Sequence, residues 1–290
     1  MMGYNLYNLF YFDNEWTKSN INNIFPEEKE NKTKWNAAWE AYIISHKQYL
    51  NETVLHILDK QYKIAINKVQ SPNISLHAKE ALSTHLFLAY LHGHLELDEG
   101  GLIYLYFKQA DIDTRNRAMW DYFKNIYPYA KQKNNSILNR YYILWDYRIE
   151  QLEEDIKIKK ISTEDAFKEI KWYGVLFSEM RDYSEDLLKR MEKIVVITNG
   201  ISDVFIYNIL KILQEYIDSY FKIVLNILSI YIQAEGEQGW LWFNREDVVR
   251  NILERIKEKL EDLEDKAKYS RIVDELHSKG YDINGISLED

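Results

Sequence analysis

The chain of 290 residues contains no cysteine, three prolines and ten glycines. The lack of cysteine excludes disulfides, thiolate metal sites and a cysteine nucleophile. It is also typical of cytoplasmic proteins, so we expect a cytoplasmic location. Proline and glycine are the strongest local signals for turns and breaks. Because both are scarce, we expect few turns with long elements between them, which favours helices.

Apolar runs of membrane-spanning length are missing as well. The longest uncharged inner stretch, IVLNILSIYIQA at 223–234, has 12 residues, whereas a helix that crosses a bilayer needs about 20. The opening MMGYNLYNLFYF is apolar, but it has neither a basic leading region nor a small-residue cleavage site before Asp13. It therefore does not resemble a signal peptide, and we expect no membrane association.

Positive charge is scarce relative to negative charge. The formal net charge is -9 and the isoelectric point is near 5.4, which argues against a nucleic-acid partner because phosphate binding needs basic surface. With 46% hydrophobic and 29% charged residues, the composition is that of a folded globular protein.

Apolar residues recur at helical spacing along most of the chain. Trp35, Trp39 and Tyr42 form one such stripe, and Val249, Ile252 and neighbouring apolar residues form another. We predict an all-α fold of about a dozen helices, arranged as an irregular α-solenoid of stacked antiparallel helical hairpins. A compact multi-helix bundle is the alternative. The expected helices lie near residues 14–24, 32–49, 51–68, 75–92, 100–110, 113–126, 136–158, 163–180, 184–198, 202–213, 215–234, 244–261 and 263–279.

The most linker-like stretch is KQKNNS at 131–136. It predicts an N-terminal helical lobe over residues 1–130 and a C-terminal helical lobe over residues 137–290, with one continuous helical array as the alternative.

A group of histidines around LHGHLEL at 91–97 raises the question of a metal site. His85 and His92 are seven residues apart, which is two helical turns, or roughly 10 Å, whereas zinc-binding helices place histidines one turn apart. Gly93 is expected in the left-handed conformation that ends a helix, with His92 in the last turn and His94 beyond it. We therefore interpret the segment as a capped helix end with surface histidines, and we predict no metal site.

Motifs that mark catalysis or cofactor binding are also absent from the sequence. It contains no phosphate-binding glycine loop, no dinucleotide fingerprint and no nucleophile elbow. Runs of carboxylates such as EED at 153–155 are typical of solvated helix faces. We therefore predict a non-enzymatic protein that has neither catalytic residues nor a cofactor.

Aromatic residues are abundant, with 23 tyrosines and eight tryptophans. Half-exposed tyrosine and tryptophan side chains commonly anchor protein interfaces, and Trp172, Tyr173, Trp240 and Trp242 are the candidate partner-binding residues. The alternative is ordinary packing in a protein from an AT-rich genome, which would favour tyrosine, asparagine, isoleucine and lysine. In that case Trp240 and Phe243 simply pack at the start of a helix.

Several segments together resemble the helical C-terminal region of large bacterial signal-transduction NTPases of the STAND type and of related multidomain proteins implicated in anti-phage defence. These segments are HLFLAYLHGHLEL, YFKQADIDTRNRAMWDYF, WYGVLFSEM, GEQGWLWFNREDVVRNILERI and RIVDELHSKGYD. The likeness extends over about two thirds of the chain. It rests on helix landmarks, among them the helix bearing His85, the Arg115–Ala118 helix, the Gly239-Trp240 element and the Gly280-Tyr281 turn. The resemblance also implies that the family accepts other polar residues at the positions of His92 and His94.

The resemblance implies a helical-repeat protein that recognises or scaffolds another protein in an anti-phage defence system. The implied partner is an effector or NTPase subunit, or a phage protein, because these residues contain no nucleotide-binding module and any such chemistry would lie on another chain. We expect either a separately encoded domain or a piece of a longer protein. Two alternatives stay open, namely an effector enzyme or toxin with an unrecognised site, and a purely structural oligomerisation module.

Overall fold

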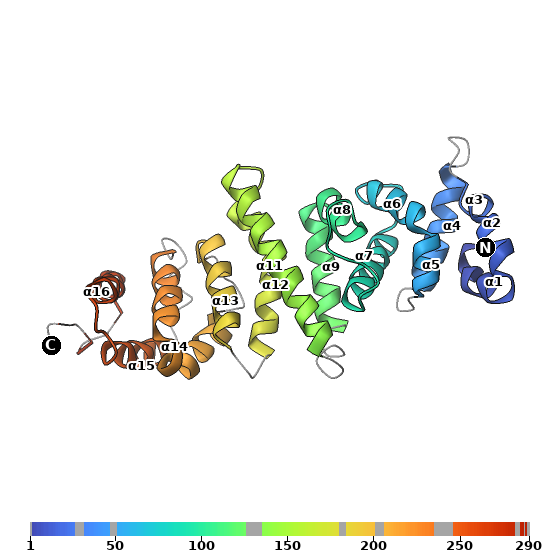
Figure 1. Ribbon diagram of the computed structural model, residues 1–290. Coiled ribbons are helices and arrows are strands. Elements are labelled where there is room, and N and C mark those ends of the chain that lie inside the picture. The colour runs from blue at the N-terminus through green and yellow to red at the C-terminus, as the bar shows by residue number, and fades with distance from the viewer. Residues whose placement is uncertain are drawn as a thin grey trace. The chain divides into compact units, whose positions relative to one another are not determined.

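The computed structural model describes residues 2–26, 32–46, 51–125, 135–179, 184–200, 206–234, 246–281, 285–286 and 288. Every regular element among them is a helix (Figure 1), so the prediction of an all-α fold is confirmed. None of the helices in these ranges is long and apolar enough to cross a membrane.

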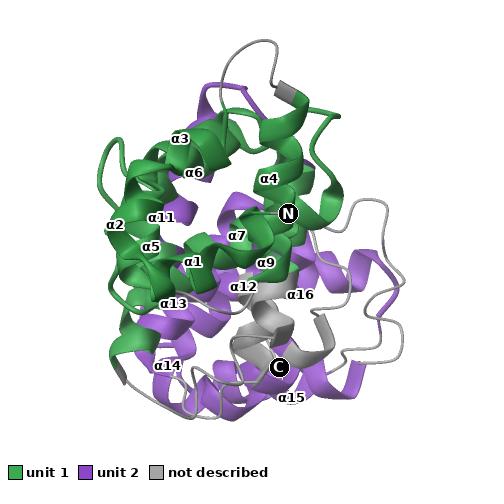
Figure 2. Ribbon diagram, turned by 90° about the vertical axis from the view of Figure 1, so that its right-hand side faces the viewer, with its two compact units in different colours: residues 1–144 green, residues 145–290 purple. Residues whose placement is uncertain are grey.

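The chain divides into two compact units, residues 1–144 and 145–290 (Figure 2). The boundary lies inside α11 (Asn135–Lys157), a continuous helix. The linker-like stretch KQKNNS begins before this helix, and its residues 131–134 lie outside the described residues.

Unit 1 is built mostly from short helices. In chain order, before the first part of α11, they are η1 (Gly3–Asn5), α1 (Leu6–Phe12), α2 (Asn14–Ser19), α3 (Ile21–Ile24), α4 (Lys32–Ser45), α5 (Glu52–Ile57), α6 (Asp59–Asn67), α7 (Leu76–Leu91), α8 (Leu102–Gln109) and α9 (Ile112–Asn125). Helix α7 lies at the centre and packs against α4, α8 and α9. A helix that is apolar on most sides is expected in a buried position. Most of α7 is indeed buried, including its polar Ser83, Thr84 and His85.

The aromatic stripe of α4, a helix that packs against α7, forms a further part of the core of unit 1. Trp35 and Trp39 stack with their ring centres 5.7 Å apart, and Trp39 meets the edge of Tyr62 from α6 at 5.1 Å. The buried indole N–H of Trp35 donates to Gln61 Oε1 at 2.7 Å. The Trp35 ring thus has both apolar contact and a polar partner for its N–H group.

Unit 2 is organised around α14 (Ile206–Ala234), whose two helical segments meet at a kink at Tyr220. After the second part of α11 the unit contains α12 (Thr163–Glu179), α13 (Glu185–Ile197), α14, α15 (Glu246–Lys257) and α16 (Leu263–Ser278). Helix α14 packs against α12, α13, α15 and α16. Side-chain caps begin three of these helices. Ser162 accepts from the Asp165 amide, Ser184 accepts from the Leu187 amide, and Asp262 accepts from the Asp265 amide.

Some expected boundaries are wrong. Two helices were expected at 202–213 and 215–234, and α14 does consist of two helical segments, but the break between them lies at Tyr220 (φ -138°, ψ 42°), six residues later than expected. The helix expected at 51–68 is instead divided at Leu58 into α5 and α6, and the one at 14–24 is divided at Asn20. Residues 6–12, for which no helix was expected, form α1.

Candidate functional site

Of the four sequence-based partner residues, the structure describes the side chain of Trp172 only. Trp172 lies on α12 and is half-buried, with the Lys171 ammonium 5.1 Å from the centre of its ring. The side chain of Tyr173 and the whole of Trp240 and Trp242 lie outside the described residues. The assignment of these four residues to a partner interface stays a prediction.

The end of α7 follows the sequence-based interpretation. Gly93 has φ +80°, the His94 amide donates to the Ala89 carbonyl at 2.8 Å, and the Gly93 amide donates to the Tyr90 carbonyl at 3.0 Å. These two bonds form a Schellman motif, the usual glycine-dependent end of a helix. His92 is exposed and caps the helix, so the expected helix end is confirmed.

His85, two turns before this helix end, has a fully buried side chain. Its Nε2 atom hydrogen-bonds the carbonyl oxygen of His46, and its Nδ1 atom lies 2.7 Å from the Tyr62 hydroxyl. Because a carbonyl only accepts, Nε2 carries the proton and Nδ1 must accept from Tyr62. Burial, the largest cause, lowers the pKa of His85 from 6.5 to about 4, so the ring is neutral at physiological pH.

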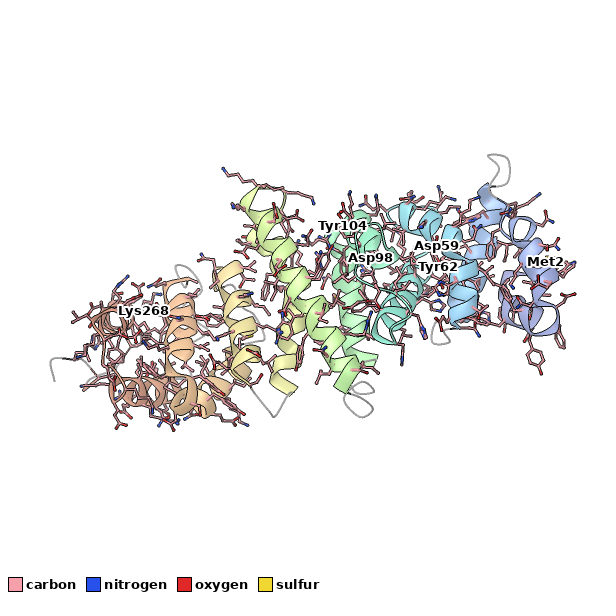
Figure 3. The ribbon with its side chains drawn as sticks, in the orientation of Figure 1. Met2, Asp59, Tyr62, Asp98, Tyr104 and Lys268 are labelled. Atoms are coloured by element: carbon pink, nitrogen blue, oxygen red, sulfur yellow. The ribbon has the colours of Figure 1, made fainter. Side chains whose placement is uncertain are left out.

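This bond fixes the direction of a longer chain of hydrogen bonds. The Tyr62 hydroxyl, whose only proton points to His85, must accept from the Tyr42 hydroxyl 3.1 Å away. Tyr62 is labelled in Figure 3. Burial, followed by the neighbouring Tyr62 and Tyr7 hydroxyls, raises the pKa of Tyr42 well above 10. The network is therefore neutral throughout, as a low-dielectric interior favours.

Tyr7 on α1 lies beside this network. Its ring stacks on Tyr42 with centres 6.2 Å apart and lies 4.4 Å from the ring of His46. The network of His85, Tyr62 and Tyr42 is thus covered by Tyr7 of α1.

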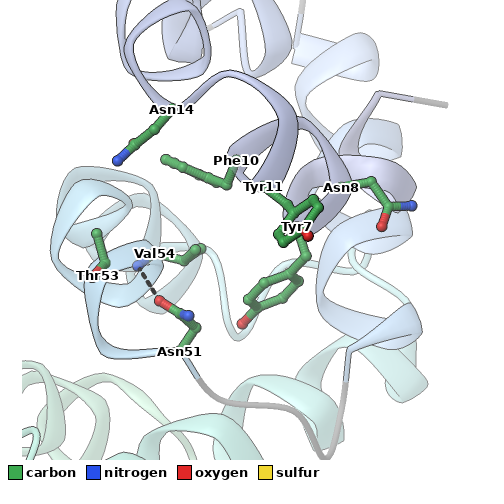
Figure 4. A pocket seen from close by; sticks show the side chains of 8 residues that line it. All are labelled: Tyr7, Asn8, Phe10, Tyr11, Asn14, Asn51, Thr53 and Val54. Carbon is green, nitrogen blue, oxygen red and sulfur yellow. Dashed lines mark hydrogen bonds between the residues drawn. The ribbon is translucent and has the colours of Figure 1, made fainter.

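Tyr7 also lines an open groove between α1, α2 and the start of α5 (Figure 4). The groove has a volume of about 520 Å³, within the range typical of ligand sites. Its described lining residues are all uncharged, namely Tyr7, Asn8, Phe10, Tyr11, Asn14, Asn51, Thr53 and Val54. The amide oxygen of Asn51 accepts from the Val54 amide at 3.1 Å, shown as the dashed line in Figure 4.

Large exposed aromatic side chains accompany this groove. Tyr11 is 87% exposed and Phe12 is 81% exposed, and their rings meet edge to face with centres 5.6 Å apart. Tyr4 and Trp16 are also exposed. We refer to these four exposed residues of η1, α1 and α2 together as the N-terminal aromatic surface. Tyr11 also lines the groove.

Sequence reasoning missed this surface, although a signal was present. Residues 1–12 were weighed only as a signal peptide, yet they carry aromatic residues at positions 4, 7, 10, 11 and 12. A surface helix can bury only one stripe of its residues. Where aromatic side chains occupy several sides of the same helical turn, some of them therefore remain in solvent.

Charged and titratable groups elsewhere have structural roles. Within the ranges that the structure describes, no three His, Asp or Glu side chains are grouped so as to hold a metal ion. The Arg148 and Glu169 side chains form a two-bonded ion pair at 2.7 and 3.2 Å, fully enclosed between α11 and α12. Such pairs fix how helices pack.

Comparisons with protein-family models, with curated proteins and with solved structures gave no match for this chain.

Proposed function

We propose that this chain is a non-enzymatic protein-binding module that recognises or scaffolds another protein through the N-terminal aromatic surface. One observation carries the proposal. Tyr11 and Phe12 leave more than four-fifths of their side-chain surface in water, which is unusual for large rings unless a partner covers them. Aromatic residues are the enriched anchors of protein interfaces.

The cellular setting of this proposal comes from the resemblance to STAND-type defence NTPases. By that resemblance the helices would form an irregular α-solenoid, and the partner would be an NTPase or effector subunit or a phage protein. Binding would then change the assembly of the associated effector, while the chemistry would be carried out by another chain.

A crosslinking experiment tests the proposal at the level of single residues. The photoreactive amino acid benzoylphenylalanine replaces Phe12 in one version of the full chain and Ile143 in another. Ile143 is an exposed apolar residue of the same unit that lies outside the aromatic surface. We expect one protein to crosslink at position 12 and not at position 143, in cells with or without phage challenge.

Tryptophan variants give a matched control. Trp16 is 44% exposed and Trp120 is 45% exposed, so Trp16→Ala and Trp120→Ala remove similar surface from two places. We expect Trp16→Ala to weaken binding of the crosslinked protein at least tenfold, as an interface anchor does, and Trp120→Ala to leave it unchanged. Equal crosslinking at positions 12 and 143, or equal effects of the two variants, would contradict the proposal.

A second copy of the chain is a distinct outcome of the same experiment. If the protein crosslinked at position 12 is this chain itself, and sedimentation velocity shows a dimer that Trp16→Ala dissociates, the surface is an oligomerisation interface and the chain has a structural role.

A further inference from the structure

We propose that the groove between α1, α2 and the start of α5 binds a short neutral oligosaccharide, with the Tyr11 ring packed on the face of one sugar and the Asn51 amide NH₂ donating to a sugar hydroxyl. This site goes beyond the proposed protein-binding function and does not depend on it. Four features of the groove carry the inference, namely its neutrality, the donor that Asn51 supplies, its mixed polar lining and its openness.

The groove is uncharged, although the sequence places a carboxylate next to its lining residues on both walls. Asp13 instead accepts from the Trp16 amide at 2.9 Å and caps α2. Glu52 lies 3.4 Å from the ring of His94, which follows α7. Neither of these two described residues lines the groove. A charged ligand would lose its hydration there without gaining an opposite charge, so the groove favours a neutral ligand.

Asn51 offers a ligand a hydrogen-bond donor of known orientation. Its amide oxygen accepts from the Val54 amide at 3.1 Å and thereby caps α5 (Figure 4). This bond decides which end of the carboxamide carries the oxygen, because an NH₂ group cannot accept. The NH₂ group is therefore the part of this side chain that a ligand acceptor, such as a sugar hydroxyl oxygen, can bind.

The other polar groups of the lining suit a ligand whose groups both donate and accept. Asn14 of α2 and Thr53 of α5 are exposed and line the groove from its two walls. A carboxamide offers both an oxygen and N–H groups, and a threonine hydroxyl does both with one atom. Sugar hydroxyls have the same double capacity, so they can bond to either wall in whichever direction the geometry requires. A peptide backbone, with one donor and one acceptor per residue in fixed order, matches this lining less well.

The aromatic part of the lining is open to solvent. Tyr11 is 87% exposed, and Tyr7 and Phe10 are only half-buried. An apolar peptide side chain gains most from enclosure, because only then is its whole surface removed from water. A sugar ring instead has a C–H face that can pack on an aromatic ring, while the hydroxyl groups around its edge stay hydrated or bond to the amides. An open groove with an exposed ring therefore favours a saccharide over a peptide side chain.

Binding of uncharged trisaccharides to the full chain, followed by NMR shifts of the amide signals, tests the inference directly. The probes are maltotriose, cellotriose, mannotriose and chitotriose. Trigalacturonate is the charged counterpart, and acetyl-Gly-Ala-Leu-Ala-Gly-amide is the peptide counterpart. We expect saturable binding of at least one neutral trisaccharide, and binding of both counterparts at least about tenfold weaker.

Two variants of Asn51 test its donor role. Asn51→Ser keeps an oxygen that caps α5 but removes the NH₂ group, and we expect it to weaken trisaccharide binding about tenfold, as the loss of one hydrogen bond does. Asn51→Asp also keeps the cap, and a sugar hydroxyl can reverse and donate to the new carboxylate oxygen, so we expect binding to be retained. A ligand carbonyl would lose affinity in both variants, and a merely structural role of Asn51 would leave both unchanged. Asn22→Ser, at an exposed position outside the groove, is the control and should bind as the unchanged chain does.

Variants of Tyr11 test the packing of the sugar on its ring. Tyr11→Ala removes the ring and should weaken trisaccharide binding about tenfold, whereas Tyr11→Phe keeps the ring and should retain binding. Tyr4→Ala removes an exposed ring outside the groove and should have no effect.

Each contrary outcome is specific. If none of the four trisaccharides binds, or if Asn51→Ser and Tyr11→Ala bind as the unchanged chain does, the inference is wrong. Tighter binding of the capped peptide than of any trisaccharide would also overturn it and assign the groove to a peptide. Failure of the proposed function is recognised separately, because it shows as the absence of crosslinking at position 12, whatever the sugars do.

Discussion

The two units solve the same problem, a polar group in a helical interior, in different ways. Unit 1 buries a neutral chain of His85, Tyr62 and Tyr42, which Tyr7 covers beside a groove. Unit 2 buries a charged pair, Arg148 with Glu169, whose side chains are 3% and 0% exposed.

The difference is one of charge and of direction. A neutral chain carries little desolvation penalty, and its hydrogen-bond direction is set from the His46 carbonyl through His85 and Tyr62 to Tyr42. An ion pair closes on itself with two parallel bonds, so it fixes the packing of two helices but leaves a charge uncompensated if either partner is lost. Loss of one group should therefore cost more stability in the ion pair of unit 2 than in the neutral network of unit 1.

The largest expected effect comes from breaking the ion pair. Glu169→Ala leaves the Arg148 guanidinium buried without its carboxylate, and we expect the free energy of unfolding to fall by about 3–5 kcal/mol in urea titrations. The double variant Arg148→Met with Glu169→Leu removes both charges and should regain most of that loss. Asp165→Ala, which breaks the partly exposed pair with Lys168, is the control and should cost less than about 1 kcal/mol. If the double variant is no more stable than Glu169→Ala, buried charge is not the cause.

The next effect is the pH dependence of unit 1. The pKa of His85 is about 4 in the folded chain against 6.5 ordinarily, so between these values the unfolded chain binds a proton that the folded chain does not. The stability that neutral His85 contributes is therefore fully present above about pH 6.5. It is lost as pH falls towards 4, and the free energy of unfolding decreases by up to about 3 kcal/mol. Burial also lowers the pKa of His46, which adds in the same direction. The measurement is the free energy of unfolding at pH 7 and at pH 4.5.

Two variants separate His85 from other acid-sensitive groups. His85→Gln keeps a polar side chain that does not titrate and should flatten the difference between the two pH values. His77→Gln, at an exposed position, should leave that difference as it is in the unchanged chain. An unaltered pH difference in His85→Gln would show that acid acts elsewhere.

The smallest effect is expected at Gly93, which we compare with Gly200 of the other unit. Gly93 and Gly200 both have positive φ, but a Cβ at Gly93 would meet nothing within 4 Å, whereas one at Gly200 would lie 2.6 Å from the Ala234 Cβ and 3.0 Å from the Ile230 carbonyl oxygen. We expect Gly93→Ala to lower the unfolding free energy by about 1 kcal/mol through backbone strain alone. Gly200→Ala should cost about 1–3 kcal/mol more, because it also forces α14 away. Equal losses would mean that α14 can move away from a Cβ at position 200 without lowering the free energy of unfolding.

The sequence allowed the helical class and several helix ends to be predicted, because these depend on neighbours a few residues apart. The stripe of Trp35, Trp39 and Tyr42 is buried as its spacing indicated, and Gly93 ends α7 as expected. The burial of His85 could not be read in this way. It depends on Tyr62 and on the His46 carbonyl, which lie 23 and 39 residues away along the chain.

The candidate site likewise combines a feature that is visible in the sequence with one that only the fold creates. The aromatic residues of the opening segment are visible in the sequence, but the groove exists only because α1 and α2 lie beside the start of α5 (Figure 4). Nothing local links Tyr7 with Asn51.

The sequence by itself determined that this protein is helical, acidic and rich in aromatic side chains, since composition and 3.6-residue periodicity act locally. Only the tertiary structure decided which aromatic rings are buried, which stay in water, and which way the hydrogen bonds of Tyr42, Tyr62 and His85 point. The physical reason is that burial and bond direction are set by groups brought together from distant segments, and a buried polar atom takes whatever partner the packing supplies.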